Sequence, residues 1–397
     1  MQIGLLREGK NPPDKRVPFS PKQCRSIMLK YPKISIFIQS SSIRCFKDSE
    51  YERNGVKVCE DLSMCDVIMG VKEVPVEMLI PNKVFFFFSH TIKKQPYNKK
   101  LLQEIIKQKI QLVDYETLVD ENNKRIIGFG RYAGIVGCYN TFLAYGKKHN
   151  VYDLNYAHHL SNKLELESEL KKVKLSKNFK IILTGLGRVA SGAKEILDFL
   201  DIKFVNKNKF INKTYDYPVY TQLEPMDYYK RSDGSPSLKS DFYKFPEKYS
   251  SILLNYCHNV QILITGHYHA PNNPVILSND DIKSTNFSIN VIGDISCDIN
   301  EPIASTIRPS TINDPIYGYN PISKSEDNYM KDDVIAVMAV DNLPCSLPKD
   351  ASEDFGEVFI ENLLPDLLNH GSVIKRASIT RNGSLTKKFK YLTDYIL

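Results

Sequence analysis

The stretch FKIILTGLGRVASGAKEILDFL, residues 179–200, decides the fold of this chain. It opens with five residues rich in β-branched and aromatic types, passes through a glycine turn and continues with apolar residues at helical spacing. This order predicts a buried strand, a tight turn and an amphipathic helix, which is the opening unit of an α/β domain.

The glycine turn has the pattern Gly185-x-Gly187-x-x-Ala190-x-Gly192. The first glycine permits the tight turn, the second lets the backbone approach a pyrophosphate, and small residues at 190 and 192 allow the helix to pack closely on the sheet. The helix N-terminus would then present its positive end to the phosphates. We therefore predict a dinucleotide site at this turn, with a plain strand-to-helix turn as the alternative.

The residue that would bind the adenosine ribose is not acidic here. In NAD enzymes an Asp or Glu about 20 residues after the glycines has that role. The end of the next predicted strand, IKFVNKNK, instead offers Asn206 beside Lys203, Lys207 and Lys209. These lysines could bind the 2′-phosphate of NADP or simply be solvated, so both NAD and NADP stay open as cofactors.

Strand-length apolar runs alternate with helical patterns from the N-terminus onward, which predicts an α/β domain with a mostly parallel sheet. The predicted strands are IGLL, ISIFI, DVIMGV, KVFFFF and IQLVDY, with helices around residues 21–31 and 98–108. Two further helical patterns, Gly134–His149 and Leu160–Leu175, should connect this domain to a second one.

The second half contains the glycine turn and further strands at VQILITGHYH, FSINVIGDIS and VIAVMAVDNL. Residues 213–250 are rich in tyrosine, proline and serine and are predicted to form a long loop with short helices. The C-terminal part from Ser352 is predicted to be helical. The expected fold is α/β, with two Rossmann-like doubly wound domains separated by a cleft. Residues 1–130 plus about 345–397 would form the substrate domain and 131–344 the dinucleotide domain.

Bulk composition excludes several classes of protein. A chain of 397 residues predicts about two domains, and no apolar run approaches the 18 or so residues of a membrane span. Eight cysteines without a C-x-x-C pair argue against a zinc ribbon and a secreted disulfide framework. The net charge of +7 comes without a nucleic-acid-binding signature. The N-terminus resembles a first strand rather than a signal peptide, so a cytoplasmic location is expected.

Lys72 and His90 are the strongest candidates for catalysis. Lys72 ends the apolar run MGVKEVP and His90 follows VFFFFSH, so each ionisable group lies where a buried strand should end. Burial lowers the pKa of a lysine and histidine titrates near neutrality, so the pair could transfer protons at a carbon–nitrogen bond. Taken singly, Lys72 could instead pair with Glu73, and His90 could be a hydrogen-bonded turn residue.

A metal site is a weaker alternative. His267 and His269 in GHYH share one face of a strand end, with Cys257 and His258 nearby. Since no third or fourth ligand has suitable local spacing, no metal is predicted.

Ordered motifs extend over nearly the whole chain: REGKNPPDKRVPFSP, GVKEVP, FFFFSHTIKKQ, NKRIIGFGRYAG, GLGRVASGA and VDNLPCSLPKDAS. With them the chain resembles the lysine-forming saccharopine dehydrogenases and the lysine–2-oxoglutarate reductase domain, within the alanine dehydrogenase and transhydrogenase superfamily. The resemblance implies NAD(P)-dependent interconversion of saccharopine with L-lysine and 2-oxoglutarate through an imine. The enzyme's partners would then be small molecules, without nucleic acid or membrane.

The resemblance also implies residue roles. Lys72 would be the general base and His90 the proton donor or acceptor. Substrate contacts would come from Arg16, Gln95, Arg125, Phe129, Ser296, Cys297 and Asp298. Nucleotide contacts would come from Lys124, Gly187, Arg188, Tyr268, Ile295, Val340, Asp341, Asn342 and Leu343. Arginine suits a substrate with three carboxylates because its planar fork makes two hydrogen bonds. Surface pairs of Arg16 with Asp14 and of Arg125 with Glu121 are the alternative.

The chain departs from the fungal enzymes at Val189, where they carry a cysteine, so no redox-sensitive disulfide is expected in the glycine turn. Two other functions stay open. One is an alanine dehydrogenase-like enzyme, which also reduces an imine with a lysine and a histidine. The other is a nucleotide-binding regulatory protein that has lost turnover.

Overall fold

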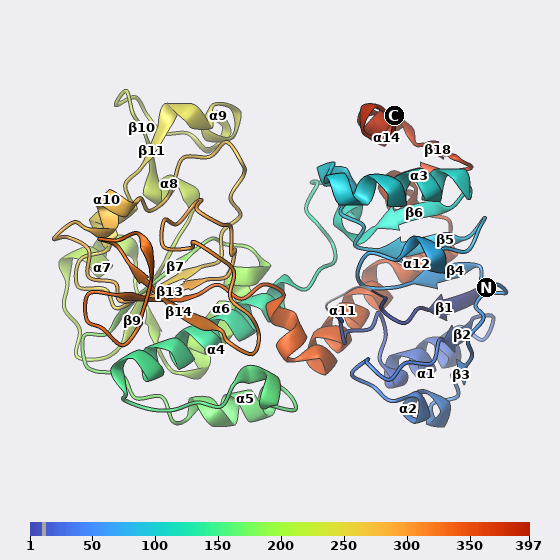
Figure 1. Ribbon diagram of the computed structural model, residues 1–397, viewed down its shortest axis with the longest axis horizontal. Helices are drawn as coiled ribbons and strands as arrows, with labels where there is room; N and C mark the ends of the chain where they lie inside the picture. Colours follow the sequence, from blue (N-terminus) through green and yellow to red (C-terminus); the bar gives the residue numbers. More distant parts are fainter. Residues whose placement is uncertain (10–12) are drawn as a thin grey trace. The chain divides into compact units, whose positions relative to one another are not determined.

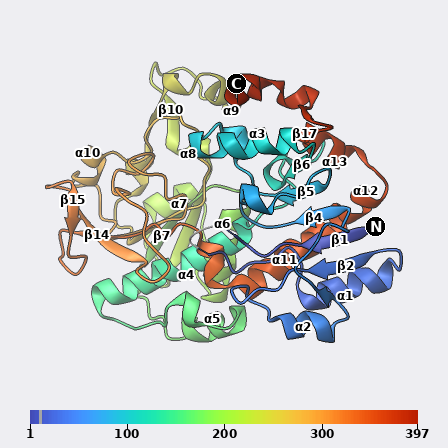
Figure 2. The same cartoon turned by 45° about the vertical axis from the view of Figure 1, so that its right-hand side comes forward.

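The computed structural model describes residues 1–9 and 13–397, so part of the N-terminal motif REGKNPPDKRVPFSP lies outside the described residues. The chain divides into two compact units (Figures 1 and 2). The first unit consists of Met1–Phe129 and Pro348–Leu397, and the second of Gly130–Leu347. Among the described helices, none is both long and apolar enough to cross a membrane.

The first unit is built on a six-stranded sheet with the order β3-β2-β1-β4-β5-β6. Its strands are β1 (Gln2–Leu5), β2 (Ser35–Ile38), β3 (Lys57–Val58), β4 (Val67–Met69), β5 (Val84–Phe87) and β6 (Gln111–Asp114). Every pairing is parallel, as the sequence predicts. All carboxyl ends of these strands therefore lie at one edge of the sheet.

Helices cover both faces of this sheet, which explains the unbroken phenylalanine run in β5. Phe85 and Phe87 pack into the apolar cluster that contains Leu102, whereas Phe86 on the opposite face contacts Phe359 with ring centroids 5.8 Å apart. The helices and the small hairpin of this unit are α1 (Pro21–Lys30), α2 (Asp48–Arg53), α3 (Lys99–Lys107), α11 (Pro348–Asn362), α12 (Leu364–Leu368), α13 (Ser372–Ala377), α14 (Thr393–Ile396), β17 (Thr380–Arg381) and β18 (Ser384–Leu385).

The second unit contains an eight-stranded sheet with the order β15-β14-β16-β13-β12-β7-β9-β8. Its strands are β7 (Lys180–Thr184), β8 (Lys203–Phe204), β9 (Val219–Leu223), β12 (Ile262–Thr265), β13 (Val291–Asp294), β14 (Ile316–Asn320), β15 (Ser325–Asp327) and β16 (Ile335–Met338). Six strands are parallel, and β14 and β15 form an antiparallel edge. The chain is thus an α/β protein whose two large sheets are one parallel and one mixed.

The remaining elements of the second unit surround this sheet. They are α4 (Gly130–His149), α5 (Lys163–Leu170), α6 (Arg188–Phe199), α7 (Lys207–Asn212), α8 (Pro225–Tyr228), α9 (Lys239–Lys244), α10 (Asn279–Ile282) and the hairpin of β10 (Tyr229–Arg231) and β11 (Tyr249–Ser251).

The prediction of a long loop with short helices at residues 213–250 was wrong in one important respect, because this segment contains the strand β9. This strand pairs with β7 along all five of its residues. The first three residues of β9, Val219, Tyr220 and Thr221, are buried. The surrounding tyrosines and prolines obscured a short apolar segment, VYTQL, whose burial comes from tertiary pairing rather than from local sequence.

Two glycines permit a very close crossing of α4 and α6. A Cβ atom at Gly134 would lie 1.9 Å from the carbonyl oxygen of Val189, and one at Gly192 would lie 1.9 Å from that of Arg131. Because each obstacle is backbone, neither helix can accommodate a methyl group without moving. The small residue at 192 therefore fixes the position of α6 and of the glycine turn that precedes it.

We predict that Gly192→Ala destabilises the second unit by about 1–3 kcal/mol or more, because the added methyl group would force α4 and α6 apart. Urea denaturation followed by circular dichroism measures this loss. Gly187→Ala is the matched control, since a Cβ at Gly187 would meet nothing within 4 Å. Equal denaturation midpoints for the two variants would contradict the close-crossing interpretation.

Candidate active site

Ionisable residues follow four neighbouring strands of the first sheet. Glu8 comes after β1, Lys72 after β4, His90 after β5 and Glu116 after β6. Since these strands are parallel neighbours, their carboxyl ends bring the four segments to the same edge of the sheet.

The backbone before Lys72 is held by a carboxylate that the sequence analysis did not single out. One oxygen of Glu8 accepts the N–H of Val71 at 2.6 Å, and the other accepts the N–H of Lys72 at 2.9 Å. Burial and the nearby Asp14 carboxylate raise the pKa of Glu8 to about 8, against the opposing effect of these hydrogen bonds. Lys72 itself is partly buried.

His90 is oriented by the carboxylate of Glu73. Its Nδ1 lies 2.6 Å from Oε1 of Glu73, so Glu73 pairs with His90. The preceding residue, Ser89, is fully buried and donates both its backbone N–H and its hydroxyl to Asp114 at the end of β6. His90 adopts a left-handed backbone conformation with φ of 51°, which is uncommon for a residue other than glycine. These contacts direct the imidazole.

Arg16 is buried and rigidly held. Its guanidinium donates to both oxygens of Asp14 at 3.0 and 2.6 Å, and it lies 4.1 Å above the ring of Phe129. Phe129 in turn stacks on Phe355 with ring centroids 4.5 Å apart. The partner that the surface alternative named, Asp14, is present, but Arg16 is only 3% exposed, so it is not a surface residue.

Arg125 and Gln95 are less enclosed. The Arg125 guanidinium donates to Glu116 at 3.0 Å, so its carboxylate partner in the structure is Glu116. Lys93 approaches the same carboxylate at 3.4 Å. The side chain of Gln95 accepts a hydrogen bond from Tyr97.

In the second unit, the glycine turn joins β7 to α6 as the sequence predicts. Gly185 has a φ of 89°, and a Cβ atom there would lie 2.4 Å from the carbonyl oxygen of Gly266, so only glycine fits. Gly187 precedes α6 directly and faces open space. Arg188 is the first residue of that helix.

A buried polar network lies at the ends of the neighbouring strands. Asp294, at the end of β13, accepts hydrogen bonds from the hydroxyls of Thr265, Ser296 and Thr306 at 2.6, 2.7 and 2.6 Å. Ile295 donates its N–H to Thr265 at 3.0 Å. The network fixes the backbone at 295–296, where the sequence predicts nucleotide and substrate contacts.

The other predicted contacts in this unit fall on strand ends and loops. Cys297 follows in a left-handed conformation, and burial raises the pKa of its thiol to about 12. Tyr268 is 84% exposed in the loop after β12. The run Val340, Asp341, Asn342 and Leu343 follows β16, and Lys124 lies on an exposed turn of the first unit.

Asn206 does not end the strand beside the glycine turn. It follows β8, an edge strand, and caps α7 through a hydrogen bond from the N–H of Asn208. The strand paired with β7 on that side is β9, and Gln222 near its end donates to the carbonyl oxygen of Gly185 at 2.9 Å. No periodic pattern in the sequence indicates this placement, because it results from pairing between distant segments.

His267 is a buried imidazole beside the glycine turn. Its Nδ1 lies 2.6 Å from the hydroxyl of Thr184, and burial lowers its pKa to about 4. Across the described ranges 1–9 and 13–397, no group of three or more His, Cys, Asp or Glu residues could hold a metal ion.

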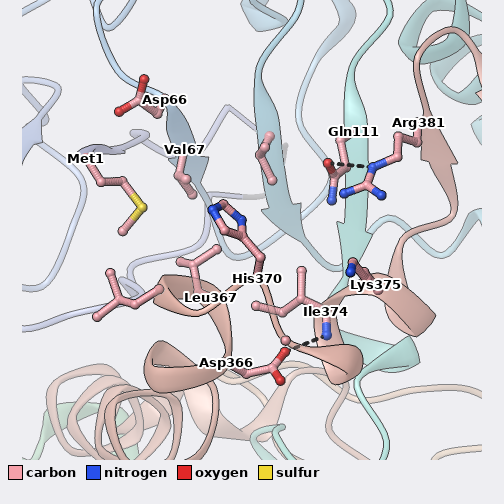
Figure 3. A pocket seen from close by; sticks show the side chains of 13 residues that line it. Met1, Asp66, Val67, Gln111, Asp366, Leu367, His370, Ile374, Lys375 and Arg381 are labelled. Atoms are coloured by element: carbon pink, nitrogen blue, oxygen red, sulfur yellow. Dashed lines mark hydrogen bonds between the residues drawn. The ribbon is translucent and has the colours of Figure 1, made fainter.

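A separate cavity of about 470 Å³ opens at the amino-terminal edge of the first sheet (Figure 3). Its lining includes Asp66 and Val67 at the start of β4 and His370, Lys375 and Arg381 from the C-terminal segment. This cavity contains no residue of the candidate site and lies at the opposite ends of the strands.

Comparisons with known proteins agree with this architecture. Residues 4–136 match the family model described as alanine dehydrogenase/PNT, N-terminal domain. Residues 4–136 therefore form a domain of the alanine dehydrogenase/PNT N-terminal family. A solved structure of L-alanine dehydrogenase aligns over 100% of both chains with a TM-score of 0.63 at 13% identity, which shows that the chain has the two-domain alanine dehydrogenase fold.

The chain is also homologous to two curated proteins. It is 31% identical to the mitochondrial α-aminoadipic semialdehyde synthase of Mus musculus over 98% of its own length, and it spans about half of that protein, 47%. It is 24% identical to the protein named saccharopine dehydrogenase [NAD(+), L-lysine-forming] of Schizosaccharomyces pombe, over 90% of this chain and 91% of the relative.

The buried His267 predicts an acid-labile second unit. Its pKa lies at about 4 in the folded state against 6.5 ordinarily, so the unfolded chain binds more protons between these values. Stability should therefore fall as pH decreases from 6.5 toward 4, by at most about 1.4 kcal/mol per pH unit. Urea denaturation across this pH range measures the slope.

His267→Asn should remove most of that slope, whereas His149→Asn, which alters an exposed histidine at the end of α4, should leave it unchanged. An unaltered pH dependence in His267→Asn would contradict the assignment.

Proposed function

We propose that this protein is an NAD(P)-dependent, lysine-forming saccharopine dehydrogenase that interconverts saccharopine with L-lysine and 2-oxoglutarate. The observation that carries the proposal is the convergence of Lys72, the Glu73–His90 pair and two arginines at one edge of the first sheet. The similarity to proteins named saccharopine dehydrogenase supports the choice of substrate.

Lys72 acts as the general base toward the substrate amine and water. Its backbone N–H donates to Glu8, which fixes the loop from which the side chain extends. His90 donates or accepts the proton at the carbinolamine oxygen. Glu73 accepts a hydrogen bond from Nδ1 of His90, and its carboxylate stabilises the imidazolium. The other ring nitrogen, Nε2, is then the atom that exchanges protons with the substrate.

Cations in the same region suit a substrate with three carboxylates. Asp14 and Phe129 fix the orientation of the Arg16 guanidinium, so the arginine binds carboxylate without losing further side-chain freedom. Arg125 and Lys93 share the carboxylate of Glu116 and can exchange it for a substrate carboxylate. Gln95, Phe129, Ser296, Cys297 and Asp298 are the further proposed substrate contacts.

The residues at the glycine turn fit a dinucleotide. The space beside Gly187 is open, and the twelve-residue helix α6 begins immediately after it, so its N-terminal N–H groups can bind a pyrophosphate. When bound, the nicotinamide would supply or accept the hydride at the imine carbon. The further proposed nucleotide contacts are Lys124, Gly185, Arg188, Tyr268, Ile295, Val340, Asp341, Asn342 and Leu343.

We predict that Gly187→Ala weakens NAD(P)H binding at least about tenfold, because the methyl group would occupy the space that the pyrophosphate takes. Fluorescence titration with NADH and NADPH measures the affinity. Protein stability should not change, since the new Cβ has no neighbour within 4 Å. Unchanged affinity would place the dinucleotide elsewhere.

The activity test follows oxidation of NADH or NADPH with lysine plus 2-oxoglutarate, and then with pyruvate plus ammonia. Turnover with the first pair is expected. Turnover with pyruvate and ammonia alone would favour an alanine dehydrogenase-like enzyme, and nucleotide binding without either turnover would favour a regulatory protein.

Lys72→Met should lower turnover by about 10² or more while nucleotide affinity stays the same, because only the proton transfer is lost. Lys57→Met is the matched control, since Lys57 is an exposed lysine on the edge strand β3 of the same unit. Full turnover in Lys72→Met would remove Lys72 from the mechanism.

A further inference from the structure

Glu8 joins two neighbouring strands at the edge that carries the candidate catalytic residues. It follows β1, and it accepts the N–H groups of Val71 and Lys72, which follow β4. Each carboxylate oxygen accepts one N–H, at 2.6 Å and 2.9 Å. Both oxygens are therefore needed, and a side chain with a single acceptor cannot reproduce the contact.

The loop that carries Lys72 depends on this carboxylate. Strand β4 ends at Met69, and beyond it the N–H of Gly70 donates to the carbonyl oxygen of Phe86 while the carbonyl oxygen of Val71 accepts from Phe88. These bonds hold the loop to β5 on one side. Glu8 holds it to β1 on the other side, at the backbone N–H of Lys72 itself.

The same segment continues into Glu73, which binds Nδ1 of His90. A displacement of the backbone at 71–72 would therefore move the start of the Lys72 side chain and the carboxylate that orients His90. One acidic side chain thus determines the placement of both groups proposed for proton transfer.

The ionised form of Glu8 lowers the stability of the folded protein. Burial and Asp14 raise its pKa to about 8, so its ionised form destabilises the folded protein. Buried ionisable groups with perturbed pKa values concentrate at functional sites, where such a cost is tolerated.

We propose that Glu8 is a positioning residue that fixes the Lys72 amine and the Glu73–His90 pair by binding the two backbone N–H groups of residues 71 and 72. This inference rests on the proposed function only in that it takes Lys72 and His90 as the groups that transfer protons.

Substitution by glutamine tests the two-oxygen requirement. In Glu8→Gln, an amide NH₂ would face a backbone N–H, so one hydrogen bond is replaced by repulsion between donors. Above about pH 8, where Glu8 is ionised, we expect kcat to fall by about tenfold or more with an unchanged KM for NAD(P)H. Glu8→Asp keeps both oxygens at a shorter reach and should retain more activity than Glu8→Gln. If Glu8→Gln does not fold, Glu8→Asp against wild type carries the test.

Glu60→Gln is the matched control, because Glu60 is an exposed acid of the same unit whose contact is an ion pair with Arg7. It should retain wild-type kcat. Equal kcat for wild type, Glu8→Gln and Glu8→Asp would overturn the proposal.

The pH profile separates positioning from a general loss of structure. Asp14 and Arg16 face Glu8 from the segment that follows it, and Tyr115 faces it from the end of β6. The loop after β4 contributes the backbone N–H groups of Val71 and Lys72. Above about pH 8 the ionised Glu8 accepts both bonds, and below it the protonated acid resembles glutamine. The ratio of wild-type to Glu8→Gln kcat should therefore be larger above pH 8 than below it, and a constant ratio would overturn the proposal.

A substrate-free measurement keeps this inference distinct from the proposed function. Trace acetylation of the native protein, with each modified lysine quantified by mass spectrometry, reports the environment of the Lys72 amine directly. Relative to exposed Lys57, labelling of Lys72 should change in Glu8→Gln and not in Glu60→Gln. Wild-type protein without turnover but with this labelling change would refute the proposed function and retain the role of Glu8, whereas unchanged labelling refutes that role.

Discussion

The parallel pairing of β4 between β1 and β5 is the constraint on which the candidate site depends. It places the segments after these three strands at one edge of the sheet, so that a carboxylate after β1 reaches the backbone after β4. A glutamate after β4 in turn reaches the imidazole after β5. No single segment contains this site, and each pair of contacts crosses from one strand to its neighbour. Such crossings use the ends of strands whose middles are buried and rigid, which holds the ionisable groups without a dedicated loop structure.

The sequence was sufficient where the chemistry is local. The glycine turn, its strand and its helix could be predicted because glycines stand at positions 185, 187 and 192, where close approach of the backbone requires them. Lys72 and His90 were predicted as strand-end residues because each follows an apolar run long enough for a buried strand. The alternating contacts of Phe85, Phe86 and Phe87 explain why that run has no polar face.

The sequence was insufficient where spatial order differs from chain order. Strand β1 pairs with both β2 and β4, so the partnership of Glu8 with the Lys72 loop links residues 64 positions apart. In the second unit, β9 inserts between β7 and β8, which moves Asn206 to an edge strand and brings Gln222 to the glycine turn. Neither arrangement leaves a periodic signal, because both result from pairing energies between distant segments. The contact of Arg125 with Glu116 was not predicted either, whereas the local pair of Arg16 with Asp14 was named from the sequence, although as a surface pair.

Polar groups at the strand ends of both units are held by hydrogen bonds to neighbouring protein groups. In the first unit carboxylates orient cations and an imidazole, and in the second Asp294 collects three hydroxyls. Such preorganisation stabilises developing charge during reaction because little reorientation is required.

The most direct test of the central claim is a crystal structure with saccharopine bound. The account predicts that Lys72 Nζ and His90 Nε2 both lie within about 3.5 Å of the substrate's bridging nitrogen or adjacent carbon. Saccharopine bound with either group out of reach of that bond would contradict it.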